Sequence, residues 1–189
     1  MQHVVLSGAY WSLASGARPW SDQEHCPHSF ISRVKAASDA GFGGMGFWHT
    51  DLRHLAALHS WRDLKQILDD HGITYIEVEF LLDWFLDGER KQKSDIERDF
   101  LLDAAEGLGA DHIKVGDFFR EACPLDKMSE RFAQICRMGR ERGTNILYEL
   151  TPPIFSQIDN VDDALKLIRD AGEPNGGIMF DIGTWCVPA

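Results

Sequence analysis

Residues 60–81, SWRDLKQILDDHGITYIEVEFL, contain one complete helix-to-strand unit. Ser60 can cap a helix and Gly72 can end it. Between them, apolar side chains recur every three or four residues: Trp61, Leu64, Ile67 and Leu68. The nine residues that follow are rich in β-branched and aromatic side chains. This stretch therefore predicts a helix over 60–72 and a strand over 73–81.

The same alternation continues toward both ends of the chain. We expect further strands at 4–13, 43–49, 111–118, 145–150 and 176–182. We expect further helices at 29–41, 95–109, 126–143 and 161–172. The charged run DGERKQKSD before the helix at 95 is expected to be solvated surface. Six strands and five helices in strict alternation predict right-handed βαβ units and a parallel α/β sheet.

Two closures of such a sheet compete. A doubly wound sheet usually carries a glycine-rich phosphate turn after its first strand, and residues 7–20, SGAYWSLASGARPW, contain no G-x-G-x-x-G. A (β/α)8 TIM barrel instead has its chemistry on the loops after the strands. Polar and aromatic residues do gather at the predicted strand ends, which favours the barrel. Because eight units need about 250 residues, we expect 1–189 to be a single, incomplete barrel domain with about six strands.

Composition excludes several classes of protein. Hydrophobic residues make up 44% and charged residues 26%, which rules out wholesale disorder. A formal net charge of -11 argues against general binding to nucleic acid or anionic membranes. No apolar run approaches the roughly 20 residues that span a bilayer. The four cysteines are far apart and predict reduced thiols in a cytoplasmic protein: Cys26, Cys123, Cys136 and Cys186.

Two acids lie near the ends of successive predicted strands. Glu149 is in LYELTPP and Asp181 is in IMFDIG. Since neighbouring parallel strands lie about 4.8 Å apart, carboxylates at equivalent heights can share one divalent cation. Oxygen ligands suit Mg2+ or Mn2+, and an added histidine would admit Zn2+ or Co2+. The alternative is that each acid binds backbone amides of the following loop.

Other residues at the strand ends are candidate substrate contacts. His49 could contact a hydroxyl or shuttle a proton, or be a hydrogen-bonded strand end. Glu77 and Glu79 share parity, so they point to the same side. Glu79 could orient a ligand or His49, or could instead be solvated or paired with an arginine. Lys114 could hold a phosphate or polarise a carbonyl, although many such lysines extend to solvent.

The aromatic residues have two interpretations. Trp11, Trp48 and Trp84 could form an apolar wall for the carbon face of a sugar, or could pack in the core. The EHCPH segment at 24–28 has neither zinc-finger spacing nor a second pair of ligands, which favours an ordinary loop. The sequence has no G-x-S-x-G elbow for a serine nucleophile.

Five segments together resemble the xylose isomerase-like TIM-barrel superfamily, which includes sugar-phosphate isomerases and epimerases. They are GFGGMGFWHTDL (41–52), HGITYIEVEFL (71–81), LGADHIKVG (108–116), NILYELTPP (145–153) and GGIMFDIG (176–183). The resemblance runs the whole length of the chain but covers only the first three quarters of the family's barrel.

The resemblance implies a metal-dependent site. Family members hold a divalent metal with Glu on strand five, Asp on strand six and two further ligands on strands seven and eight. Glu149 matches the first ligand and Asp181 the second, while the last two have no counterpart here. In the epimerases the strand-five and strand-eight glutamates also form an acid/base pair, of which Glu149 would be one member. Members usually carry a histidine where this chain has Thr184.

Several functions follow as hypotheses. The first is a metal-dependent isomerase or epimerase of sugars or sugar phosphates, working through an enediolate by carboxylate proton transfer. A dehydratase would use the same enediolate. A third hypothesis is a non-catalytic, truncated barrel whose open sheet edge at strand six is covered by a homo-oligomer. Endonuclease IV-like activity is disfavoured by the net charge.

Overall fold

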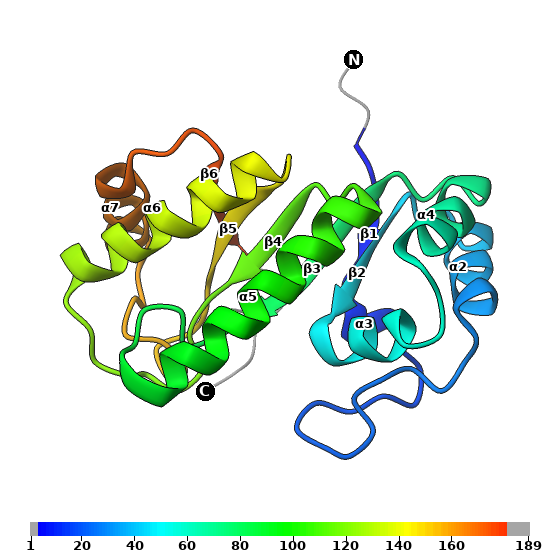
Figure 1. The fold of residues 1–189 in the computed structure, drawn as a ribbon, viewed down its shortest axis with the longest axis horizontal. Coiled ribbons are helices and arrows are strands. Elements are labelled where there is room, and N and C mark those ends of the chain that lie inside the picture. Colours follow the sequence, from blue (N-terminus) through cyan, green and yellow to red (C-terminus); the bar gives the residue numbers. More distant parts are fainter. Residues whose placement is uncertain (1–3, 181–189) are drawn as a thin grey trace. The chain divides into compact units, whose positions relative to one another are not determined.

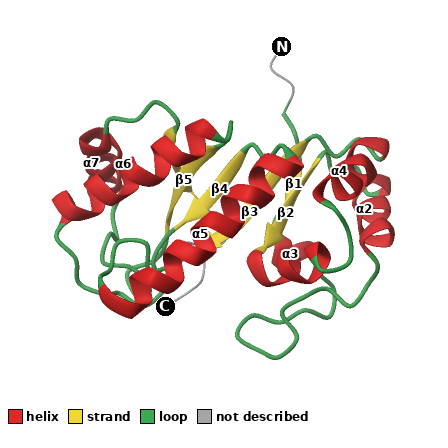
Figure 2. Ribbon diagram, in the orientation of Figure 1, coloured by secondary structure: helices red, strands yellow, loops and turns green. Residues whose placement is uncertain are grey.

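The structure is a computed structural model that describes residues 4–180 (Figure 1). Strands and helices follow one another along the chain (Figure 2). The predicted strict alternation is wrong at two places, because two helices lie between β1 and β2 and two between β2 and β3. The strands are β1 (Ser7–Gly8), β2 (Gly44–Trp48), β3 (Tyr75–Leu81), β4 (His112–Val115), β5 (Asn145–Leu150) and β6 (Gly176–Phe180). The helices are α1 (Tyr10–Leu13), α2 (Phe30–Asp39), α3 (His49–Ala56), α4 (Trp61–Asp70), α5 (Gly88–Leu108), α6 (Leu125–Glu141) and α7 (Val161–Ala171).

The chain folds into two compact units, which are described separately. The first comprises residues up to 79 together with 104–111. In it β1, β2 and β3 pair in parallel, with Gly46 opposite Glu77 and Trp48 opposite Glu79. Helix α2 packs against α4. The core side chains come from the helices and from the strands: Phe30, Val34, Phe47, Leu64, Leu68, Ile76 and Val78.

The second unit comprises residues 80–103 and those from 112 onward. Strands β4, β5 and β6 pair in parallel, and α6 and α7 pack against β5 and β6. Trp84 is fully buried in this unit. Its ring centroid lies 6.0 Å from that of Phe132 and 6.3 Å from that of Tyr148. Its Nε1 donates to the Gly116 carbonyl at 3.1 Å. Trp84 is therefore a core residue, and its predicted alternative role in a sugar-binding wall is wrong.

The element order and the parallel pairing confirm the expected α/β class and the incomplete (β/α)8 barrel type. Among residues 4–180, no helix has the length and apolarity that crossing a membrane requires. Cys26, Cys123 and Cys136 are free thiols. Burial raises the pKa of Cys136 to about 12, so this thiol stays protonated at neutral pH.

The predicted first strand at 4–13 is wrong over most of its length. Strand β1 holds only Ser7 and Gly8, and residues 10–13 form the short helix α1. Glycine at position 8 permits this turn, because a Cβ there would lie 2.4 Å from Leu13 Cδ1. An apolar run does not distinguish a buried strand from a buried helical turn, and this one contains both.

Helix α5 begins at Gly88, seven residues before its predicted start. The charged run is helical from 88 to 95, where its charges complement one another along the helix. Lys93 pairs with Glu89 at 2.7 Å, and Lys91 pairs with Asp95. Such pairs between residues i and i+4 stabilise a helix. Glu89 and Lys93 are highly exposed, so the expected solvation of this run is confirmed for them.

Gly107 tests the packing of the first unit. In a helix interior, glycine-to-alanine substitution ordinarily stabilises by about 0.5–1 kcal/mol. Here a Cβ would lie 2.5 Å from the Cβ of Trp61. We therefore expect Gly107→Ala to lower the free energy of unfolding by about 1–3 kcal/mol in chemical denaturation.

The control is the same substitution in a Trp61→Gly background, which removes the Cβ as well as the indole. Without these atoms, the added methyl should regain its ordinary stabilising sign. A loss that persists in this background would show that the contact with Trp61 is not its cause.

Candidate functional site

The predicted site residues fall in both units and are described unit by unit. In the first unit, Glu77 and Glu79 are buried on one face of β3, as their parity predicts. The amide of Tyr10 donates to Glu79 Oε1 at 3.2 Å. A Cβ on residue 46 would lie 2.9 Å from Glu77 Oε1 and 3.2 Å from Glu79 Oε1. Glycine at this position in β2 therefore makes room for both carboxylates.

Aromatic residues neighbour Glu79 in the same unit. Trp48 lies opposite Glu79 in the sheet, and Trp11 follows Tyr10, whose amide binds Glu79. The rings of Trp11 and Trp48 lie 5.1 Å apart, and those of Trp48 and His49 lie 4.5 Å apart. Trp48 is buried, whereas Trp11 and His49 are half-buried. His49 begins α3 rather than ending a strand as predicted. Aromatic faces combined with hydroxyl-accepting carboxylates are suited to a polyhydroxylated ligand.

In the second unit, Lys114 and Glu149 form a buried ion pair. Lys114 Nζ lies 3.1 Å from Glu149 Oε2, and the two side chains are 9% and 8% exposed. Glu149 lies on β5 opposite Met179, and Lys114 lies on β4 opposite Leu147. Lys114 therefore does not extend to solvent. The cation compensates the carboxylate where water has little access.

Asp181, the other predicted metal ligand, lies outside the described residues. Within residues 4–180, no group of three or more histidine, cysteine or acidic side chains could hold a metal ion. The EHCPH segment agrees with the predicted loop. There the Cys26 amide donates to Asp51 Oδ1 at 3.0 Å, and the ring of His25 stacks on that of His54 at 4.2 Å.

Asp117 is a structurally important acid that the sequence interpretation missed. It follows β4 in HIKVGD and is buried. Its Oδ1 accepts from the amides of Phe119 (2.9 Å) and Arg120 (3.1 Å), and its Oδ2 accepts from the Gln157 amide at 3.4 Å. One carboxylate thus fastens the loop after β4 to the loop after β5. An aspartate directly after the glycine that follows β4 is the sequence feature that marks it.

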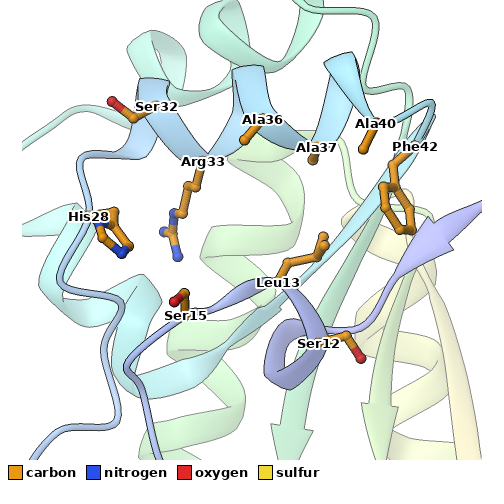
Figure 3. Close-up of a pocket in the computed structure, with 10 residues that line it drawn as sticks. All are labelled: Ser12, Leu13, Ser15, His28, Ser32, Arg33, Ala36, Ala37, Ala40 and Phe42. Atoms are coloured by element: carbon orange, nitrogen blue, oxygen red, sulfur yellow. The ribbon is translucent and has the colours of Figure 1, made fainter.

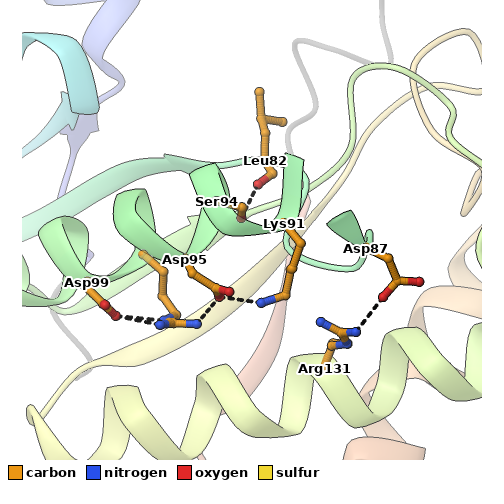
Figure 4. A network of polar contacts seen from close by, with 8 residues as sticks. Leu82, Asp87, Lys91, Ser94, Asp95, Asp99 and Arg131 are labelled. Atoms are coloured by element: carbon orange, nitrogen blue, oxygen red, sulfur yellow. Dashed lines mark hydrogen bonds and ion pairs between the residues drawn. The ribbon is translucent and has the colours of Figure 1, made fainter. Parts of the chain in front are cut away.

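The start of α5 is held by a second network in the same unit (Figure 4). Ser94 donates to the Leu82 carbonyl at 2.6 Å, and Arg131 of α6 pairs with Asp87 at 2.9 Å. Arg90 donates to both carboxylate oxygens of Asp83, whose φ is +59°. The same guanidinium pairs with Glu121. The loops after β3 and β4 are thereby joined by charge-assisted hydrogen bonds.

Residues 34–186 match the family model described as xylose isomerase-like TIM barrel. Solved structures with the same fold include the probable 3-DHS dehydratase AsbF of Bacillus anthracis, with 20% identity and a TM-score of 0.71. They also include a D-psicose 3-epimerase of Clostridium cellulolyticum H10, with 11% identity and a TM-score of 0.76. Each match covers 94% of this chain and 63% of the solved one.

An L-ribulose 3-epimerase is similar at 16% identity and a TM-score of 0.73, over 93% of this chain and 60% of the other. The chain therefore spans less than two thirds of each of these structures. At such identities the likeness shows the fold alone. No match was found among curated proteins.

The Lys114–Glu149 pair generates a stability prediction. Lys114→Met removes the cation beside a buried carboxylate, and we expect it to lower the free energy of unfolding by about 3–5 kcal/mol. Lys114→Met combined with Glu149→Leu should recover at least about 1 kcal/mol relative to the sum of the single changes. Chemical denaturation of all four proteins measures this coupling. Simple additivity would refute a mutual interaction.

Asp117 generates a pH prediction. Burial raises the pKa of Asp117 above its ordinary value, although the amides of Phe119, Gln157 and Arg120 partly oppose the shift. The folded state therefore holds this proton more tightly than the unfolded state. Stability from this group is present below its unfolded pKa and is lost as pH rises through its raised folded pKa.

Asp117→Asn removes that titration. From about pH 3.8 upward, we expect the free energy of unfolding of the wild-type chain to fall relative to that of the variant, until Asp117 is fully ionised in the folded state. Urea denaturation across pH 3 to 8 measures the difference between the two proteins. A difference that stays constant over this range, or one that grows in the opposite direction, would contradict the direction of the shift.

Proposed function

The chain belongs to the xylose isomerase-like TIM-barrel family, and from this premise we propose isomerase or epimerase chemistry on a sugar or sugar phosphate. The observation that carries the proposal is the buried Lys114–Glu149 pair near the carboxyl ends of β4 and β5. In this class of fold, reacting groups come from the carboxyl ends of the strands. The D-psicose and L-ribulose 3-epimerases among the similar structures support the substrate class.

Glu149 is the proposed proton-transfer group. Its carboxylate takes the proton from the carbon beside the substrate carbonyl, and the C–H electron pair becomes the double bond of an enediolate. The carboxyl group then returns the proton to a carbon of the enediolate. Isomerisation needs the proton to return to the neighbouring carbon and a second proton to move between the two oxygens. Epimerisation instead needs a proton to be delivered to the original carbon by a donor on the opposite face. Lys114 Nζ lies within ion-pair distance of Glu149 and compensates the carboxylate before the transfer.

The first unit has a proposed sugar-binding surface of its own. The half-buried Trp11 ring offers a surface for the carbon face of a sugar, supported from behind by Trp48. His49 and Glu79 are the proposed partners for hydroxyl groups. Because Glu79 accepts from the Tyr10 amide, its carboxylate is held in a fixed orientation and is suited to select a hydroxyl position.

A divalent cation (Mn2+, Mg2+, Co2+ or Zn2+) held by Glu149 and Asp181 is the expected cofactor. The described residues supply only the first of these two ligands and contain no group of three suitable side chains. They therefore do not by themselves fit a metal site, and the proton transfer proposed above is derived from the protein side chains. The homo-oligomer and the cytoplasmic location expected from the sequence also remain predictions.

A dehydratase is the second candidate, because the probable 3-DHS dehydratase aligns with 94% of this chain. The first step would be the same proton removal by Glu149. The enediolate would then expel the hydroxyl group on the next carbon, which leaves as water after taking up a proton. Side-chain positions alone do not separate this outcome from isomerisation.

Deuterium exchange tests the proposal at its first step. The chain is incubated in D2O with D-psicose, D-fructose, D-tagatose or L-ribulose, with each divalent cation and with EDTA. We expect NMR to show deuterium at the carbon beside the carbonyl, and Glu149→Gln to slow exchange by at least about 100-fold. Glu141→Gln, at an exposed site on α6, is the matched control and should leave the rate unchanged.

Each alternative has its own readout. Exchange that survives Glu149→Gln would overturn the role of Glu149. A parallel incubation uses 3-DHS, the compound named for the similar dehydratase. Loss of water from 3-DHS without deuterium exchange into any of the sugars would favour the dehydratase. No exchange and no dehydration with any cation would support the non-catalytic barrel.

A further inference from the structure

A cavity of about 420 Å3 lies between α2 and the segment around α1 in the first unit. Its size falls within the range of ligand-binding clefts. Figure 3 shows α2 along one side, with Leu13 and Ser15 facing it from the other. The residues that line it include none of those assigned above to the sugar site.

One buried polar side chain points into this cavity. Arg33 is 7% exposed, and its guanidinium reaches from α2 toward Ser15 and Leu13 (Figure 3). Its Nη2 lies 2.5 Å from Oδ2 of the fully buried Asp51. Its Nε is buried and has no hydrogen-bond partner within the described residues. A buried N–H donor without an acceptor lowers the stability of the fold. A ligand that supplies an acceptor would therefore gain binding free energy there.

Aromatic rings hold this guanidinium in place. Arg33 Cζ lies 5.3 Å from the ring centroid of Phe30 and 5.8 Å from that of Phe47. Asp51 is itself fixed by the Cys26 amide. The donor direction of Arg33 is therefore set before any ligand arrives, so little ordering is lost on binding.

The lining defines the class of ligand. It contains two potential cations, Arg33 and His28, and no acid, although the whole chain carries a net charge of -11. Leu13, Ala36 and Phe42 belong to its apolar part. Because Asp51 already neutralises one edge of Arg33, a single negative charge fits better than a doubly charged phosphate.

We propose that this cavity binds a small monocarboxylate with an apolar body. The carboxylate accepts a hydrogen bond from Arg33 Nε, and the apolar body lies against Leu13, Ala36 and Phe42. This site is independent of the proposed sugar chemistry, so either proposal can fail without the other.

Hexanoate and 1-hexanol are matched probes for the test. They share the chain length and differ in the carboxylate. We expect hexanoate to shift the NMR signals of the Ala36 and Ala37 methyl groups and of Arg33 Nε–H. We also expect it to bind about tenfold or more tightly than 1-hexanol. Equal binding of the two probes, or no shift at tens of millimolar, would overturn the proposal.

Ala36→Leu fills the cavity and leaves the Arg33–Asp51 pair in place, so it tests the site without exposing a buried charge. It should abolish the hexanoate shifts. Ala56→Leu, at an exposed position on α3, is the matched control and should bind like the wild-type chain. Unchanged binding by Ala36→Leu would overturn the proposed location. Signals that change with protein concentration and resist hexanoate would show that a second copy occupies the cavity instead.

Discussion

A carboxylate that is buried between parallel strands and helices must be compensated where water does not reach. This protein meets that requirement at Glu79, Asp117 and Glu149, and at Asp51 beneath α2. Glu79 accepts from a backbone amide, and Asp117 accepts from three. Glu149 instead faces a cationic side chain, and Asp51 faces one in addition to the Cys26 amide. The positions of loops and side chains around the candidate sites follow from these pairings.

The choice of compensating group separates structural acids from reactive ones. Asp117 accepts from backbone amides of two loops. Breaking these hydrogen bonds would therefore release both loops. Glu149 faces the flexible ammonium group of Lys114, which can move to another partner without breaking backbone structure. A carboxylate that faces a side-chain cation can change partner while its backbone contacts stay in place, which suits the proton-transfer role proposed for it. The geometry therefore favours Glu149 over Asp117 as the reacting acid.

Much of this fold could be predicted from the sequence, because the strands from 43 onward combine short apolar runs with glycine-ended helices. The shared face of Glu77 and Glu79 followed from parity alone, since residues two apart in a strand point the same way. The segment 10–13 could not be assigned in this manner, because its turn depends on Leu13 packing over Gly8. The early start of α5 depends on ion pairs along its surface and on Asp87 meeting α6, so an apolar pattern missed it.

The buried charge pairs show where such prediction stops. Arg33 and Asp51 lie 18 positions apart, and Asp117 accepts from the Gln157 amide 40 positions away. Periodicity carries no information on which distant charges meet, since each side chain alone is also compatible with a solvated surface. Only the packing of α2 over β2 shows that Arg33 is enclosed by Phe30 and Phe47 and aimed at a cavity. The Arg33 Nε that is unpaired within residues 4–180 is therefore visible only in the folded chain. Such a buried donor marks a candidate binding site away from the strand ends, where the family fold would place one.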